Sequence, residues 1–120
     1  MSDARMSPVV EWQIVTTDAP AEAAFYVELF GWKVSTANAL GYRQVNTGEG
    51  GVNGGIWPAP PTAHSFVQLF VRVAEVNATV AEATRLGAKV IVPATVLPDG
   101  DTMAVLADPC GITFGVTARS

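Results

Sequence analysis

Residues 10–34, VEWQIVTTDAPAEAAFYVELFGWKV, and residues 67–90, VQLFVRVAEVNATVAEATRLGAKV, are two versions of one pattern. Each begins with a strand-like segment, passes through an acidic residue and a helical stretch, and ends in Gly-x-Lys-Val. Asp18 and Glu75 are paired at an offset of 57 residues, and Gly31 and Gly87 at an offset of 56. A repeat of about this length indicates two copies of one small module, so it decides the architecture.

The first copy predicts a strand, a helix and three further strands. Apolar and polar residues alternate over 9–16, Asp18 is suited to cap a helix, and Gly31 is suited to end it. The further strands are expected at 32–36, 41–47 and 52–57, between turns rich in Asn and Gly. The helix is expected to pack on its sheet through four apolar residues: Ala21, Ala24, Phe25 and Leu29.

The second copy follows a stiff linker, PAPPT at 58–62, and repeats this order. The segment 66–73 alternates, with Val67 and Leu69 on the side expected to face the helix. That helix is expected to bury Val76, Val80, Ala83 and Leu86, and to end at Gly87. Strands at 89–92 and 102–107 flank the loop PATVLPDGD, and Asp108-Pro109-Cys110-Gly111 predicts a type I turn before a last strand.

Together these elements predict an α+β protein of two βαβββ modules in a single domain, residues 1–120. Module one spans about 9–57 and module two about 65–117. Because each helix covers one sheet face, the opposite faces are left for function. Those faces carry Glu11, Gln13, Gln68, Phe70 and Arg72.

Composition excludes several classes of function. A net charge of −4 does not suit nucleic acid, since phosphate binding needs clustered Lys and Arg. No apolar run approaches a membrane span, and no signal region precedes residue 10, so we expect a cytoplasmic protein without membrane contact. The single cysteine, Cys110, excludes an internal disulfide. The sequence around Cys110 contains no electropositive partner that would activate its thiolate as a nucleophile.

The chain resembles the vicinal oxygen chelate superfamily, which includes glyoxalase I, extradiol dioxygenases and bleomycin-resistance proteins. The resemblance rests on Asp18 with Phe25-Tyr26 and Leu29-Phe30-Gly31-Trp32, and on Leu86-Gly87-Ala88-Lys89-Val90 with Asp108-Pro109-Cys110-Gly111. It implies two βαβββ modules that form a curved mixed sheet around a concave pocket, with the helices on the outer face. Members of the superfamily often form dimers.

Catalytic members of this superfamily hold a divalent metal with His and Glu at matched strand positions. Carried over by the resemblance, these positions fall on Glu11, Gln68, Gly115 and a glycine at 54–55. One carboxylate alone does not hold such a metal tightly. We therefore expect no metal site and no cofactor.

Six residues are the candidates for ligand binding: Glu11, Gln13, Gln44, Trp57, Gln68 and Phe70. Gln68, between two phenylalanines, could hydrogen-bond a ligand or bridge two structural groups. Gln44 shares a strand face with Tyr42 and Asn46, and Trp57 could stack on a ligand or close the core. Glu11 could be a residual ligand, a general base or a solvated carboxylate, whereas Trp12 and Trp32 are expected in the core.

Three functions stay open from the sequence. The leading hypothesis is a small-molecule-binding protein of the glyoxalase and bleomycin-resistance type that lacks the usual metal and sequesters its ligand. The alternative is a glyoxalase- or dioxygenase-like enzyme, a lyase, isomerase or oxidoreductase, that is metal-free or uses an atypical metal site. An interaction domain is the third. We also expect a homodimer, since Trp57, Phe66 and Phe70 lie on predicted strand faces.

Overall fold

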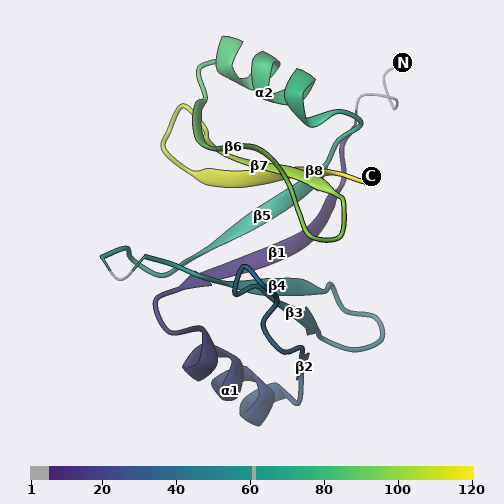
Figure 1. The fold of residues 1–120 in the computed structure, drawn as a ribbon, viewed down its shortest axis with the longest axis vertical. Helices are drawn as coiled ribbons and strands as arrows, with labels where there is room; N and C mark the ends of the chain where they lie inside the picture. The colour runs from purple at the N-terminus through teal and green to yellow at the C-terminus, as the bar shows by residue number, and fades with distance from the viewer. Residues whose placement is uncertain (1–5, 61) are drawn as a thin grey trace. The chain divides into compact units, whose positions relative to one another are not determined.

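The protein is α+β, and its computed structural model describes residues 6–60 and 62–120. The described residues form the order βαβββ twice (Figure 1), which confirms the predicted duplication. The first copy consists of β1 (Val9–Thr16), α1 (Ala19–Phe30), β2 (Lys33–Val34), β3 (Arg43–Asn46) and β4 (Gly54–Pro58). The second consists of β5 (Phe66–Arg72), α2 (Val76–Arg85), β6 (Lys89–Val96), β7 (Thr102–Ala107) and β8 (Thr113–Ala118).

The chain divides into two compact units, Glu11–Gln68 and Leu69–Ser120, the latter joined by residues up to Val10. Both have the same topology. The strand order is β2-β3-β4-β1 in one and β6-β7-β8-β5 in the other. The first strand of each module pairs in parallel with the last, and the remaining pairs are antiparallel. Neither described helix is long and apolar enough to cross a membrane.

The two helices begin at the acidic residues that the repeat aligned. The Asp18 carboxylate accepts a hydrogen bond from the Ala21 amide at 3.1 Å, as predicted for an N-cap. Glu75 accepts from the amides of Asn77 and Ala78 at 2.7 and 3.2 Å. Gly31 ends α1 in the left-handed region, at a φ of 74°, which glycine adopts without strain.

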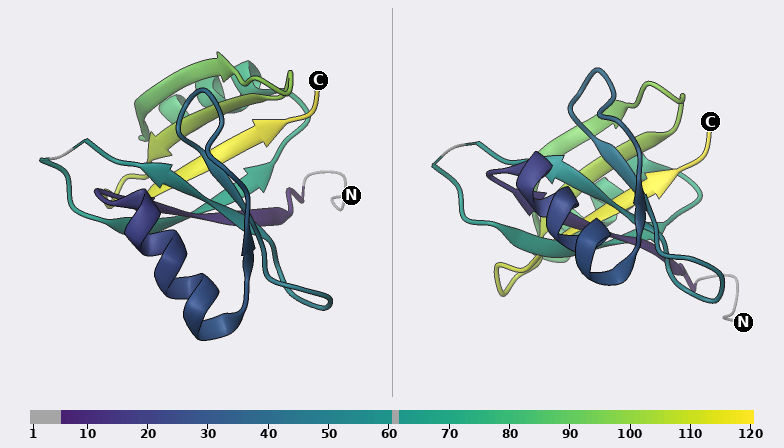
Figure 2. Two further views of the ribbon diagram at one scale, coloured as in Figure 1. Left: turned by 60° about the horizontal axis from the view of Figure 1, so that its bottom comes forward. Right: turned by 90° about the horizontal axis from the view of Figure 1, so that it is seen from below.

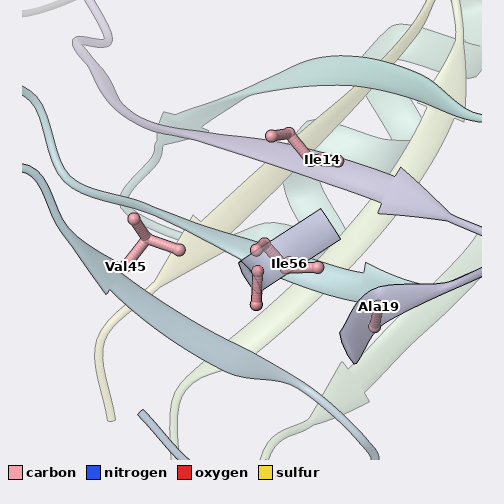
Figure 3. Close-up of a cluster of buried hydrophobic side chains, with 5 residues drawn as sticks. Ile14, Ala19, Val45 and Ile56 are labelled. Carbon is pink, nitrogen blue, oxygen red and sulfur yellow. The ribbon is translucent and has the colours of Figure 1, made fainter. Parts of the chain in front are cut away.

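The core of module one lies between α1 and one face of its sheet (Figure 3), and Figure 2 shows the helix lying against that sheet. Trp12 and Trp32 pack at its margin with their ring centroids 5.5 Å apart, and Trp32 stacks on Tyr26. The prediction that both tryptophans belong to the core is therefore confirmed. The buried members are Ile14, Ala19, Ala23, Val45 and Ile56.

The predicted orientation of α1 is wrong. The helix buries Ala19 and Ala23 against the sheet, whereas the four residues expected there are exposed. The physical reason is that α1 is apolar on nearly every side, so its periodicity does not select one face. The rotation of α1 about its own axis is instead consistent with the stacking of Tyr26 on Trp32.

The core of module two forms under α2, which packs on β6, β7 and β8. Val76, Val80 and Ala83 face it as predicted, but Leu86 is exposed because the helix ends at Arg85. Val67 and Leu69 are exposed as well, against expectation, because α2 does not lie over that part of β5. The buried cluster is Val76, Ala104, Leu106, Val116 and Ala118.

Two segments near the end of the chain can be compared with the structure predicted for them. The segment from Pro93 to Val96 continues β6, although a loop was expected after residue 92. β6 lies at the sheet edge and its pairing with β7 is irregular at two places, so a proline is tolerated there. The Asp108 turn is confirmed, since the Gly111 amide donates to the Asp108 carbonyl oxygen at 2.8 Å.

Candidate functional site

A row of residues crosses the sheet face of module one that lies opposite α1. Gln13 of β1 pairs with Gly55 of β4, and Gly55 pairs in turn with Gln44 of β3. Directly opposed residues share a face, and the next residue along each strand points the other way. Ile14 and Ile56, one position on, face α1 (Figure 3), so the row of Gln13, Gly55 and Gln44 faces away from it.

The same row exists in module two, but its chemistry differs. Phe70 of β5 pairs with Gly115 of β8, and Gly115 pairs with Val105 of β7. Phe70 is only 1% exposed and clusters with Met103 and Val105, with Leu97 packed against them. The face that is polar in module one is thus a hydrophobic cluster in module two.

These pairings show which residues of the two modules correspond. The glycine registers align Gln13 with Phe70 rather than with Gln68. The same offset of 57 residues aligns Gln68 with Glu11. The two glutamines are therefore two residues apart in the repeat, although both point away from the helix side of their strands.

The glycines of both rows lie under aromatic rings. A Cβ atom at Gly55 would overlap the Tyr42 ring, and one at Gly115 would overlap the Phe70 ring. At Gly54, on the other face, a Cβ would meet the Trp12 ring. Any larger residue at these positions would displace a ring, so close packing explains the glycines.

Module one has a polar pocket of about 540 Å³ at this face. A cation, Lys33, and a carboxylate, Glu11, lie in its wall together with several hydroxyl and amide groups. Lys33 is placed there by β2, where it pairs with Asn46. The lining residues are Glu11, Lys33, Val34, Ser35, Tyr42, Gln44, Val45, Asn46, Asn53 and Gly54.

Buried polar atoms without partners lie on three of the predicted binding residues. Within the described chain, Gln13 Oε1, Gln68 Oε1 and Trp57 Nε1 have no hydrogen-bond partner. Gln13 is 4% and Gln68 is 6% exposed. Buried polar groups in folded proteins are nearly always paired with protein, water or ligand. These three residues therefore offer two acceptors and one donor to a bound molecule.

The six predicted residues are distributed unequally around this pocket. Glu11 and Gln44 line it directly. Trp57 and Gln13 adjoin it through Tyr42, whose ring centroid lies 4.7 Å from that of Trp57 and whose ring covers Gly55 beside Gln13. Phe70 lies instead in the hydrophobic cluster of module two, and Gln68 is buried on β5 and does not line the pocket.

Lys33 and Asn53 are among the pocket-wall residues that were not predicted from the sequence. Lys33 belongs to a strand of only two residues, and Asn53 precedes β4 in a turn, where its side chain accepts a hydrogen bond from the Thr47 amide at 3.0 Å. Neither position has an alternating pattern around it that would assign a face. In the sequence, Lys33 is distinguished only by its place in the repeated Gly-x-Lys-Val motif.

The residues at the superfamily's metal positions do not suit a metal of that type. Gln68 presents an amide, Gly55 and Gly115 are covered by aromatic rings, and Glu11 is the only carboxylate of the set. Across residues 6–60 and 62–120, no three His, Cys, Asp or Glu side chains come together to hold an ion. The donors that Mg²⁺, Fe²⁺ or Zn²⁺ need are therefore missing from these positions.

Comparison with proteins of known structure supports the fold. A hypothetical protein from Bacillus halodurans, BH1468, superposes with a TM-score of 0.70 at 13% identity, over 97% of this chain and 96% of that one. Methylmalonyl-CoA epimerase from Mycobacterium tuberculosis gives a TM-score of 0.69 at 12% identity, over 98% and 95%. At such low identity, these likenesses concern the fold alone.

Comparison of sequences identifies the family. Proteins from Mycobacterium bovis and Mycobacterium tuberculosis, both named "Putative glyoxylase CFP32", are 32% identical to this chain over 109 residues. The match covers 88% of this chain and 42% of theirs, so it spans less than half the length of these relatives. Residues 10–117 match the family described as the glyoxalase-like domain. The chain therefore belongs to the glyoxalase-like domain family, within the vicinal oxygen chelate superfamily.

Proposed function

We propose that the protein binds a small organic molecule on the polar face of module one, without a metal of the superfamily type. The observation that carries this proposal is the contrast between the two rows. At matched positions, module two has Phe70 and Val105 in a hydrophobic cluster, whereas module one has Gln13 and Gln44 beside a pocket. A sheet face used only for packing has no need of these amides, because burying them costs free energy.

The chemistry of the pocket narrows the class of ligand. Small-molecule sites combine apolar walls with a few placed polar groups. Tyr42 lines the pocket and Trp57 packs on its ring, while the buried amides of Gln13 and Gln68, which are not part of the pocket wall, can accept or donate. We expect a compact ligand with hydrogen-bonding groups and a flat apolar part. Sequestration of such a ligand, as in bleomycin-resistance proteins, is the biological role that we favour.

The test is calorimetric titration of a ligand found by thermal-shift screening. Replacing Gln68 with Leu keeps the volume similar but removes both hydrogen-bonding ends. If Gln68 orients the ligand, affinity should fall by about 1–3 kcal/mol, the cost of an unpaired buried partner. Folding stability should hold or rise, because a desolvated amide is removed. Equal affinity of both proteins, or a large loss of stability, would reduce Gln68 to a structural role.

A second candidate function is catalysis, and Glu11 is the observation that favours it. Glu11 lies in the wall of the pocket, which Tyr42 also lines. Two proteins related to this chain in sequence carry the name "Putative glyoxylase CFP32". A Glu11→Gln variant separates the two functions. Binding with no turnover in either protein supports sequestration, whereas turnover by the native protein that is lost in the variant supports an enzyme.

A further inference from the structure

One end of the polar pocket of module one carries a group of hydrogen-bond donors. Lys33 of β2 pairs with Asn46 of β3, and both residues line the pocket. The next residues along these strands, Val34 and Val45, belong to the core under α1, so the pair points to the opposite face. Asn53, which precedes β4, lines the pocket as well. We call Lys33, Asn46 and Asn53 the donor cluster.

The two asparagines are oriented by the turn between β3 and β4. The Asn46 Oδ1 atom accepts a hydrogen bond from the Gly48 amide at 2.9 Å. The Asn53 Oδ1 atom accepts one from the Thr47 amide at 3.0 Å. A backbone N–H only donates, so the side-chain atom that faces it must be the oxygen. The NH2 group is therefore the other end of each side chain, and it is left to donate to a ligand.

The ammonium group of Lys33 also lacks an acceptor. Within residues 6–60 and 62–120 it forms neither an ion pair nor a side-chain hydrogen bond. Glu11 lines the same pocket, but β3 and β4 separate its strand from β2, so the two backbones are about 14 Å apart. Glu49 lines an adjoining hollow together with Lys33 and does not pair with it. The described chain thus leaves this cation without a counter-charge.

Module two has the same lysine without the amides. The repeat aligns Lys33 with Lys89, which pairs with Ala107 instead of an asparagine. The turn that follows is held by the Asp108 carboxylate, which accepts hydrogen bonds and cannot donate them when ionised. The fold therefore does not require amides beside this lysine. The donor cluster belongs to the module that has the polar pocket.

We infer that the donor cluster binds a carboxylate of the ligand, so that the pocket takes a flat carboxylic acid in its anionic form; this inference rests on the proposed function. Hydrogen bonds from ammonium and amide donors to an ionised acceptor are stronger than those between neutral groups. Lys33 balances a single negative charge, so a carboxylate fits better than a phosphate dianion. The Tyr42 ring offers the flat contact, since it covers Gly55, which is about 7 Å along β4 from Asn53.

The first test uses two probes of the same shape, hydrocinnamate and its uncharged amide, hydrocinnamamide. In proton–nitrogen correlation NMR of the labelled chain, hydrocinnamate should shift the backbone amides of 33–35, 44–46 and 53–54. Hydrocinnamamide should bind more weakly. Lys33→Met keeps most of the side-chain length and should weaken hydrocinnamate binding about threefold to tenfold, because an ion pair at an open site is worth less than a buried one. Lys89→Met, the matched change in module two, should leave the affinity unchanged.

The second test does not rely on Lys33. Asn46→Asp keeps the oxygen that accepts from Gly48 but replaces the NH2 donor with a negatively charged oxygen. The turn should persist, as the spectrum of the free variant reports, whereas hydrocinnamate binding should be lost. Asn38→Asp is the control, because the Asn38 oxygen also accepts from backbone amides but the residue does not line the pocket. It should bind hydrocinnamate like the native chain.

Three outcomes would overturn the inference. If both probes bind equally and Lys33→Met binds like the native chain, the carboxylate has no special place, yet the proposed function stands because the pocket still binds a small molecule. Native affinity in Asn46→Asp would remove the donor cluster from the site in the same way. If neither probe shifts the pocket amides, the pocket does not take flat carboxylic acids. The proposed function is then decided separately, by the neutral compounds of the thermal-shift screen.

Discussion

Phe70 and Gln13 occupy the same place in the two modules, and replacing each with Ala should separate packing from binding. Phe70 is 1% exposed, lies over Gly115 and packs with Met103 and Val105. Gln13 is nearly as buried, yet its Oε1 has no partner within residues 6–60 and 62–120. We predict that Phe70→Ala strongly lowers the free energy of unfolding, whereas Gln13→Ala barely changes it.

The magnitudes follow from burial. A Phe side chain buries about 150–250 Å². At about 25 cal/mol per Å² this is worth roughly 4–6 kcal/mol. Measured Phe→Ala losses in cores are about 3–5 kcal/mol. Gln13→Ala removes one methylene group, worth about 0.8 kcal/mol, and leaves a cavity that costs further stability, but it also removes an unpaired amide whose burial costs about 1–3 kcal/mol. The net effect of Gln13→Ala is therefore within about 1 kcal/mol of zero.

Equilibrium unfolding in urea measures both changes. With a slope of about 1–3 kcal/mol per molar urea, Phe70→Ala should lower the midpoint by about 2 M. Its loss is a large share of the roughly 6–18 kcal/mol available to a chain of this length. Gln13→Ala should keep its midpoint and lose affinity for the screened ligand. A Phe70→Ala loss below 1 kcal/mol, or an equal loss in both variants, would refute the assignment of packing to module two and binding to module one.

Two further predictions concern the glycine row and the metal. Gly55→Ala should cost about 1–3 kcal/mol of stability in urea unfolding, because the added Cβ would overlap the Tyr42 ring. Most of that cost should vanish in a Tyr42→Ser background, where the ring is absent. An equal cost in both backgrounds would contradict this prediction. Purified, dialysed protein should contain well under one equivalent of Ni, Zn, Fe or Mn by elemental mass spectrometry, since the superfamily positions lack donors. Stoichiometric metal that is lost in Glu11→Ala would favour an enzyme instead.

Local chemistry made much of the fold predictable. Asp18 and Glu75, aligned by the repeat, both cap helices, and Gly31 ends α1 where a left-handed residue is needed. Alternation over residues 9–16 assigned Gln13 to the face away from the helix. These features depend on a few neighbouring residues, so a single sequence contains them.

The features of the fold and the pocket that could not be predicted depend on contacts between distant segments of the chain. The rotation of α1 could not be read from a helix that is apolar on all sides, and it reversed the expected buried face. Phe70 was assigned to the face away from the helix, but the sequence did not reveal that Met103 and Val105 fill that face. Lys33 enters the pocket only through the pairing of β2 with β3.

The buried residues of the two modules contribute differently to the stability of the chain. Each module pairs the same strands and places a glycine under an aromatic ring, so the backbone geometry is shared. Phe70, Met103 and Val105 bury apolar area and stabilise the chain. Gln13 and Trp57 bury polar atoms that have no partner in the described part of the chain, and this burial costs free energy. Under the proposed function, module two contributes stability, whereas module one keeps polar groups whose burial costs free energy until a ligand pairs with them.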